Sequence, residues 1–358
     1  MHNKQGYILF LLFGILSVCS VLISLCFSRT IVYRQFSKLI AQEQQCQELA
    51  LSSISLAESL FTIKKNEKNT TKSSLPQNQE QEENLEQKIL SAIFPYLNKE
   101  RQFKLTHAID HFDATISLSI QSEHGKLNIN SLYDFDKKKF LNEGKPNDCK
   151  KLCTWLFDRI STITGRPSLM NAFENILKNR KSEFNDPLEL LADKDFNQQF
   201  SDTAFIDFSN NNKKLFLTDI FTVYTDIEQE PLKIINPLMF SNSWLTLLDL
   251  KIKENLTKED IQKFLEKIKP YINRKEDTST SSVYSSTWDH CFKDFYQKEY
   301  KDLPQEIKSI LTTTFEVNIF SLLVKARIGE TISSIFTIVK ANTKQHLTGF
   351  DILKTSQI

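Results

Sequence analysis

The chain has 358 residues, of which 40% are hydrophobic and 25% are charged, with a formal net charge of +1. These values are typical of a globular protein, and the length allows one large domain or two small ones. The sequence pI of about 7.6 and the lack of a basic cluster with interleaved aromatic residues argue against nucleic acid as a partner.

An uncharged apolar segment lies close to the N-terminus, at residues 7–27. As a helix it would be about 32 Å long, which matches the hydrocarbon core of a bilayer. The alternative, a cleaved secretory signal, usually has an apolar region of only about 7 to 15 residues. We therefore predict a single transmembrane helix. Its orientation does not follow from charge, because Lys4 precedes it and Arg29, Arg34 and Lys38 follow it.

The same helix is expected to continue beyond the membrane to about residue 62. Residues that break helices are nearly absent here: Gly14 is the only glycine between Gly6 and Gly125, and the first proline is Pro76. The apolar face of residues 28–62 would need a globular surface or a partner to cover it. The apolar residues at helical spacing are Ile31, Val32, Phe36, Leu39, Ile40, Leu49, Ala50, Ile54, Ala57, Leu60 and Phe61.

The pattern changes several times after the long helix. Residues 63–85 are polar and predict a linker, and a short helix is expected at 85–97. Alternating apolar and polar residues at 114–120 and 127–130, on either side of Gly125, predict a β-hairpin with one buried face. The asparagines of its second half either face solvent or bond to the helical block that follows.

Residues 149–200 return to helical spacing, and Asp186 followed by Pro187 is typical of the start of a helix. The whole chain has only seven glycines, which argues against a glycine-rich phosphate-binding loop. The remaining expected elements are strands at 215–226 and 232–238, helices at about 243–268 and 288–300, and a terminal hairpin at 315–341 that turns at Gly329.

The order of long helix, strands, helical block and strands predicts an α+β fold. Its simplest form is a long N-terminal helix on an antiparallel sheet, with a large α-helical domain inserted between the strands. The expected segments are a leader at 1–6, the transmembrane segment at 7–27, the helix continuation at 28–62, the linker at 63–85, the first part of the α+β domain at 86–147, the inserted helical domain at 148–214, and the remaining strands and helices at 215–358.

Two cysteines, Cys149 and Cys153, stand four residues apart, which places both thiols on one face of a helix. A disulfide in an oxidising compartment and a pair of small apolar residues are both consistent with this spacing. The spacing of all six cysteines does not match a zinc site.

Catalytic patterns are weak throughout the chain. His107 and His111 share a helical spacing, but the glutamate that follows the first histidine in a metalloprotease helix is absent. Ser122 and His124 lie in a predicted turn and not in a strand-turn-helix nucleophile elbow. We therefore expect a structural protein and not an enzyme.

Four stretches, taken in order, carry a resemblance to a known family. They are the short basic leader that ends at Gly6 before the apolar helix, GKLNINSL at 125–132, DPLELLADKDF at 186–196, and the segment at 215–248 with its turn at Asn236. In this order they resemble the minor pseudopilins of the type II secretion system, and among these the general secretion pathway protein K family.

The resemblance implies that prepilin peptidase cleaves between Gly6 and Tyr7 and that Tyr7 becomes a methylated N-terminus. A glycine suits such a site because it lets a protease approach the backbone closely. Most pseudopilins have a glutamate where this chain has Leu11, and the K-type members typically lack it. A carboxylate in lipid is costly unless it is paired. A subunit that starts a fibre has no preceding subunit to provide that partner.

The resemblance further implies a place at the pseudopilus tip, where the chain would initiate or cap assembly for protein export across the outer membrane. The expected partners are the I-type and J-type minor pseudopilins, the remaining pseudopilus subunits and prepilin peptidase. The chain would cross the bacterial inner membrane once, with its globular headpiece in the periplasm. The alternative interpretation is a single-span periplasmic envelope adaptor or sensor unrelated to secretion.

Calcium is a possible ligand by the same resemblance, since K-type members bind it through headpiece carboxylates. Asp219, Asp226 and Glu228 are candidates, but their spacing does not define the six to eight oxygens that calcium needs. We therefore assign no calcium ligand and expect no other cofactor.

Overall fold

The computed structural model describes most of the chain. The described residues are 3–61, 94–107, 113–145, 147–206, 214–225, 235–252, 263, 292–293, 295–311, 318–341 and 350–358. The predicted linker at 63–85 therefore lies outside the described residues.

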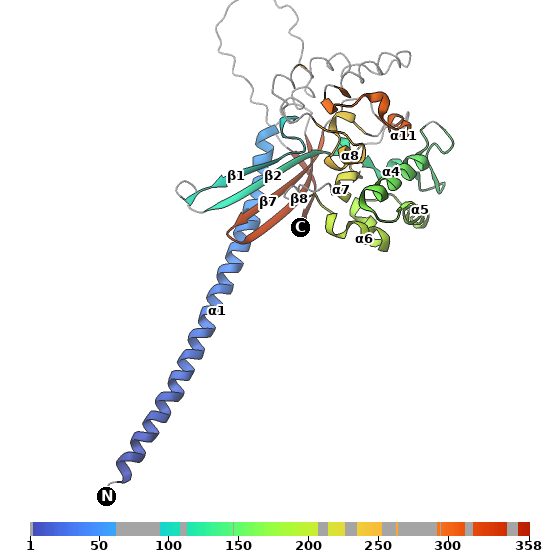
Figure 1. The fold of residues 1–358 in the computed structure, drawn as a ribbon. Helices are drawn as coiled ribbons and strands as arrows, with labels where there is room; N and C mark the ends of the chain where they lie inside the picture. The colour runs from blue at the N-terminus through green and yellow to red at the C-terminus, as the bar shows by residue number, and fades with distance from the viewer. Residues whose placement is uncertain are drawn as a thin grey trace, which may run out of the picture.

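One unbroken helix, α1 (Asn3–Phe61), forms the N-terminal part of the structure. It projects from the headpiece as a rod (Figure 1), and its 59 residues correspond to a length of about 88 Å. This confirms the predicted continuous helix. The rod places its N-terminal half far from the headpiece, while its C-terminal part lies against the sheet.

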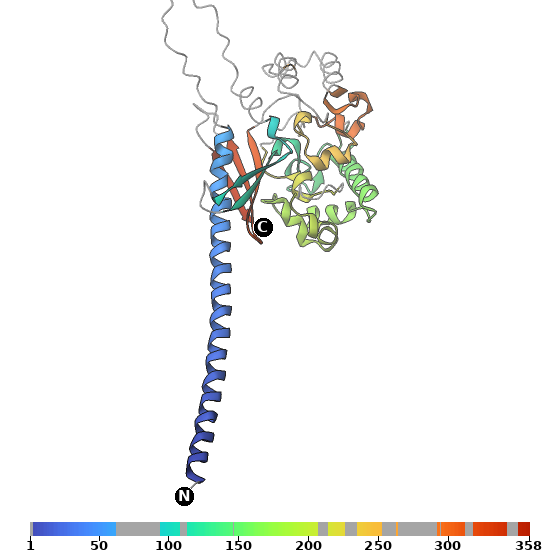
Figure 2. The ribbon, with the colours of Figure 1, turned by 60° about the vertical axis from the view of Figure 1, so that its left-hand side comes forward.

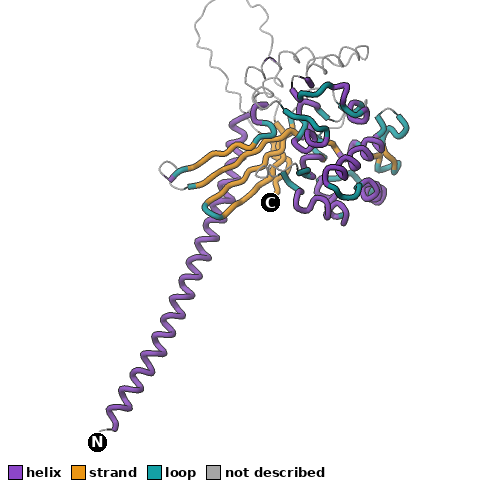
Figure 3. Tube along the Cα trace, in the orientation of Figure 1, coloured by secondary structure: helices purple, strands orange, loops and turns teal. Residues whose placement is uncertain are grey.

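The sheet has five antiparallel strands in the order β1-β2-β7-β8-β9. Strands from the two ends of the headpiece lie side by side at its centre, because β2 pairs with β7 (Figure 3). The terminal hairpin of β7 and β8 confirms the prediction, and Gly329 at its turn has a φ of +59°. The strands are β1 (Glu100–Leu105), β2 (Ala114–Ser122), β7 (Ile319–Ile328), β8 (Thr331–Ala341) and β9 (Phe350–Gln357).

The two faces of the sheet have different neighbours. Figure 2 shows α1 along one face and the helical part of the headpiece beyond the other. On the second face a small buried cluster joins the sheet to neighbouring segments. Its members are Ile206, Phe216, Ile319, Leu323, Phe336 and Ile338.

The helical part of the headpiece is built from short elements with well-formed ends. The Asp148 side chain caps α4 by accepting hydrogen bonds from the Lys150 and Lys151 amides. Asp186 and Glu189 form a capping box at Pro187, which confirms the predicted start there. The helices are α4 (Cys149–Thr164), α5 (Met170–Asn179), η4 (Pro187–Ala192), α6 (Lys194–Phe200), α7 (Leu217–Ile220), α8 (Asn242–Leu247) and α11 (Gln305–Lys308).

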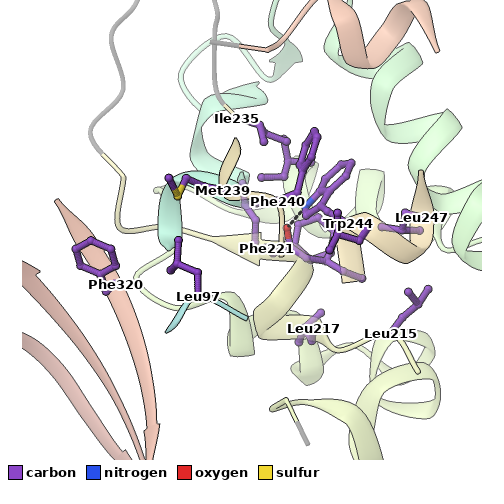
Figure 4. Packing of buried hydrophobic residues seen from close by; sticks show 14 of the residues in the cluster. Leu97, Leu215, Leu217, Phe221, Ile235, Met239, Phe240, Trp244, Leu247 and Phe320 are labelled. Carbon is purple, nitrogen blue, oxygen red and sulfur yellow. Dashed lines mark hydrogen bonds between the residues drawn. The ribbon is translucent and has the colours of Figure 1, made fainter. Parts of the chain in front are cut away.

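An aromatic core holds these elements together. Trp244 of α8 is fully buried, stacks on Phe240 at 6.3 Å between ring centroids, and donates from Nε1 to the carbonyl oxygen of Ile220 at 3.0 Å (Figure 4). A buried indole is stable here because its N–H has a partner. A long helix on an antiparallel sheet, with a helical insert, is the α+β fold that the sequence predicts.

The predicted hairpin at 114–130 is wrong. After β2 the chain forms a 3-10 helix, η2 (Glu123–Gly125), and β3 (Leu127–Asn128) then pairs in parallel with β6 (Phe221–Thr222). Gly125 serves close packing, since a Cβ atom there would lie 1.6 Å from the carbonyl oxygen of Met239. After β2 the chain therefore leaves the sheet and packs at Gly125 against the backbone of Met239.

The strands predicted at 215–226 and 232–238 are also largely wrong. The first segment forms α7 followed by the two-residue strand β6. In the second, the Asn236 side chain caps the 3-10 helix η6 (Pro237–Met239) by accepting from the Leu238 amide at 3.0 Å. Of the short helix predicted at 85–97, the described part is the 3-10 helix η1 (Phe94–Tyr96).

Two strands of the sheet were not predicted, and two predicted helices are only partly described. β1 and β9, the two edge strands, had no counterpart in the sequence prediction. Of the helix predicted at 243–268, residues 243–252 and 263 are described and include most of α8. Of the helix predicted at 288–300, residues 292–293 and 295–300 are described, and residues 292–293 and 295–296 are helical. The short elements left are β4 (Tyr133–Asp134), β5 (Lys139–Phe140), η3 (Ile129–Ser131), η5 (Ser201–Thr203) and η7 (Tyr300–Asp302).

Replacing Gly125 with alanine tests the close approach to Met239. We expect Gly125→Ala to lower the free energy of unfolding by about 2 kcal/mol or more, because the added methyl group meets backbone that cannot rotate away. Gly14→Ala is the matched control, since a Cβ atom there meets nothing within 4 Å. Urea unfolding of the full chain in mild detergent measures both. Equal stability of the two variants would contradict the packing role.

Candidate functional site

The exposed N-terminal half of α1 is the first candidate site. Among the described residues, this helix alone is long and apolar enough to cross a membrane, with a mean hydropathy of 2.6 over its best 18-residue window and none of that window buried. The predicted transmembrane segment 7–27 lies within it. Leu11 is exposed on this helix. Gly6 and Tyr7 lie in its first helical turns.

The exposed apolar surface of α1 extends beyond residue 27, past the length that a bilayer covers. Val32, Phe36 and Leu39 are 60%, 63% and 57% exposed. The first fully buried side chain of the helix is Cys46, whose thiol donates to the carbonyl oxygen of Ala326 at 3.1 Å. A region of about ten residues below the headpiece therefore presents large apolar side chains that the described part of the chain does not bury.

The junction between the sheet and the helical part is the second candidate site. Lys126 is fully buried, donates from Nζ to Glu123 at 2.5 Å, and donates to the Ser321 hydroxyl of β7 at 2.9 Å. The other Glu123 carboxylate oxygen accepts a hydrogen bond from the Thr222 hydroxyl of β6. The ion pair therefore ties the end of β2 to β6 and β7 in the interior, where an unpaired charge would be strongly destabilising.

Asp219 of α7 extends this buried polar junction. One carboxylate oxygen accepts from Gln121 Nε2 at 2.5 Å and the other from the Ser243 amide at 2.6 Å. Burial raises the pKa of Asp219, and the nearby Lys126 charge partly opposes that shift. Both oxygens already have hydrogen-bond donors, so the side chain connects β2, α7 and α8.

This arrangement does not fit a calcium site. Calcium needs six to eight oxygen ligands, whereas Asp219 is completely buried and its oxygens face N–H donors. Asp226 and Glu228, the other candidates, lie outside the described residues. Within the described part of the chain, groups of three or more metal-ligating side chains do not occur.

The asparagines of the 125–132 motif bond to neighbouring segments. Asn128 is buried and donates from Nδ2 to the Thr225 carbonyl oxygen at 2.9 Å. Asn130 forms two hydrogen bonds with the Phe184 backbone, one to its carbonyl oxygen and one from its amide. The interpretation in which these side chains bond to the helical block is therefore the one that the structure supports.

Cys149 and Cys153 are buried free thiols, one turn apart on α4. Burial raises the pKa of Cys149 to about 12, with a smaller contribution from the Asp148 charge, and burial also raises the pKa of Cys153. This is the arrangement expected for two small apolar residues in a core.

The weaker catalytic candidates do not form a reactive arrangement. The Ser122 hydroxyl accepts from the His124 backbone amide at 3.3 Å, and the His124 ring pairs with the Asn318 side chain at 2.9 Å. The serine and the imidazole therefore have separate structural partners. His107 is described, while His111 lies outside the described residues.

Three chains among the solved structures match this chain. No family model and no curated protein sequence matches this chain. The crystal structure of the GspK-GspI-GspJ complex from the enterotoxigenic Escherichia coli type 2 secretion system contains a chain that aligns with 13% identity. The alignment covers 92% of this chain and 99% of that one, with a TM-score of 0.36.

Removing the buried cation tests the polar junction. We expect Lys126→Met to lower the free energy of unfolding by about 3–5 kcal/mol, because the Glu123 carboxylate is left buried without its counterion. The control is Lys137→Met, which breaks an exposed pair with Asp134 and should cost far less stability, because water solvates both charges when the pair is broken. The double variant Glu123→Leu/Lys126→Met should recover part of the loss. Urea unfolding of the full chain measures the stability of each variant. An equal loss in Lys126→Met and Lys137→Met would contradict the role of the buried ion pair.

Thiol reactivity tests the state of the two α4 cysteines. In the folded chain at pH 8, iodoacetamide should alkylate Cys149 and Cys153 at least about 100-fold more slowly than in urea, because both are buried and protonated. Their raised pKa values also predict that stability holds below the ordinary thiol pKa near 9 and falls as the pH rises above it.

Peptide mass spectrometry reads the modification at each cysteine. The exposed variant Ser182→Cys is the control that should react rapidly in the folded chain. Protection of Cys149 and Cys153 in urea without a reductant would show a disulfide instead.

Proposed function

We propose that this chain is a minor pseudopilin of the type II secretion system that acts at the pseudopilus tip. The observation that carries the proposal is the division of α1 within one continuous helix. Its N-terminal half is apolar and exposed, and its C-terminal part packs against one face of the sheet of the headpiece. Such a helix joins a membrane anchor to a globular domain without a hinge between them.

The breadth of the headpiece supports a position at the tip. The helical part extends from the sheet on the side away from α1 (Figure 2), so the headpiece is much wider than the rod that carries it. Subunits that pack laterally beside α1 can lie below this headpiece, while its bulk restricts addition above. The chain would therefore initiate or cap assembly and would not repeat along the fibre.

The resemblance of the sequence motifs to K-type minor pseudopilins is the basis for the processing step and the partners that we propose. Prepilin peptidase would cleave between Gly6 and Tyr7, and the new Tyr7 amine would be methylated. Leu11 would leave the helix without an acidic group in the bilayer, as suits a first subunit. The I-type and J-type minor pseudopilins would pack beside α1, with the headpiece in the periplasm and the anchor in the inner membrane.

Cleavage at Gly6 tests the proposal most directly. In cells with an intact secretion apparatus, the membrane-purified chain should lack its first six residues and carry a methyl group on Tyr7. Gly6→Val should retain the leader and reduce secretion at least about tenfold, because its branched Cβ hinders access to the backbone. Intact-mass measurement and a count of secreted protein give the two results.

Gly14→Val is the matched control, since it makes the same change within the membrane segment and should leave cleavage unchanged. A wild-type chain that keeps Met1 while secretion proceeds normally would contradict the proposal. That result would favour a single-span envelope adaptor or sensor.

A further inference from the structure

One helical spacing runs through the whole of α1. Steps of four and three residues alternate without a break along one face, and this is the spacing of a left-handed coiled-coil seam. The residues of this face nearest the headpiece are small and buried against the sheet, and we call this end of α1 upper. The residues nearer the N-terminus, at the lower end, are large and exposed. In the stretch above the predicted membrane segment, the seam residues are Arg29, Val32, Phe36, Leu39, Glu43, Cys46, Ala50, Ser53 and Ala57.

The change in side-chain size separates two kinds of contact. From Cys46 upward, the small side chains allow the sheet to lie close to the helix axis. Below it, Val32, Phe36 and Leu39 have the size and spacing of knobs that insert between the residues of a neighbouring helix. The exposed Tyr33 and Ile40 lie beside the seam and widen its apolar surface. The occupant that fits this surface is therefore a second helix.

Charged residues mark both ends of the exposed seam. Arg29 lies at its lower end and Glu43 at its upper end, both exposed, and the 14-residue separation corresponds to about 21 Å along the helix. Two copies of this chain anchored in one bilayer by the same segment would lie parallel and in register. Arg29 would then meet Arg29, and Glu43 would meet Glu43. Like charges at such positions oppose association.

We propose that the exposed seam from Arg29 to Glu43 binds a membrane-anchored helix of a different protein. That helix runs parallel to α1 and has large apolar residues at the same heights. It carries an acidic side chain opposite Arg29 and a basic side chain opposite Glu43. This inference deepens the proposed function, because it identifies the face of α1 and the charge of the partner helix.

Charge reversal on the chain itself tests the seam without knowledge of the partner. The full chain and the double variant Arg29→Glu/Glu43→Lys are each fused at the C-terminus to one member of a fluorescent donor-acceptor pair and reconstituted together in phosphatidylcholine vesicles. In this mixture an acid meets a base at both ends of the seam. Energy transfer should give a dissociation constant about tenfold lower for the mixed pair than for two wild-type chains.

The control variant is Arg34→Glu/Lys38→Glu, which reverses two charges within the same stretch of the helix but off the seam. Its mixture with wild type should associate no more tightly than two wild-type chains. Phe36→Asp in either member should abolish the gain, and folding should be unaffected because all these positions are exposed.

The proposal is overturned if two wild-type chains associate as tightly as the mixed pair, since a second copy would then fit the seam. It is also overturned if the off-seam control gains equally, or if no mixture associates. These measurements do not involve secretion or cleavage, so they can fail while the proposed function holds.

Discussion

The contact between small side chains of α1 and the sheet determines how the rest of the molecule is arranged. Cys46, Ala50, Ser53 and Ala57 are buried along one face of the helix, and their size lets β7 and β8 approach its axis closely. Close-packed surfaces of this kind tolerate little change in side-chain volume. The helix and sheet therefore form one packed unit. The position of the sheet then sets the position of every element that packs on its other face.

Polar contacts orient the helical part where apolar packing alone would not. An apolar surface is non-directional, so the cluster on the far face of the sheet could accept several arrangements. Lys126, Glu123 and Asp219 are buried together at this junction and bond to side chains of β2, β6 and β7 and to a backbone amide of α8. Each needs its partners in place, because a buried ion without them is costly. The network therefore favours one arrangement of the two parts over others.

The elements that the sequence predicts correctly are those defined by neighbouring residues. The periodicity of α1, the turn at Gly329 and the capping box at Asp186 all depend on residues a few positions apart. The pairing of β2 with β7 depends on strands about 200 residues apart, and no local pattern indicates it. The hairpin turn predicted at Gly125 is wrong because a glycine that allows close packing looks the same in sequence as one that allows a turn. Lys126 and Asp219 are likewise too distant in sequence to be recognised as neighbours.

The seam of α1 shows why spacing alone could not reveal what the helix contacts. The same alternation of three and four residues continues from the membrane segment into the headpiece, and only side-chain volume and burial change along it. Large residues hold a neighbour at the distance of a second helix, whereas small residues admit a sheet. Glu43 lies between the two regions and is exposed. An apolar residue at position 43 would extend the exposed apolar seam up to the sheet. The charge of Glu43 therefore limits how far toward the sheet a neighbouring helix can pack on the seam.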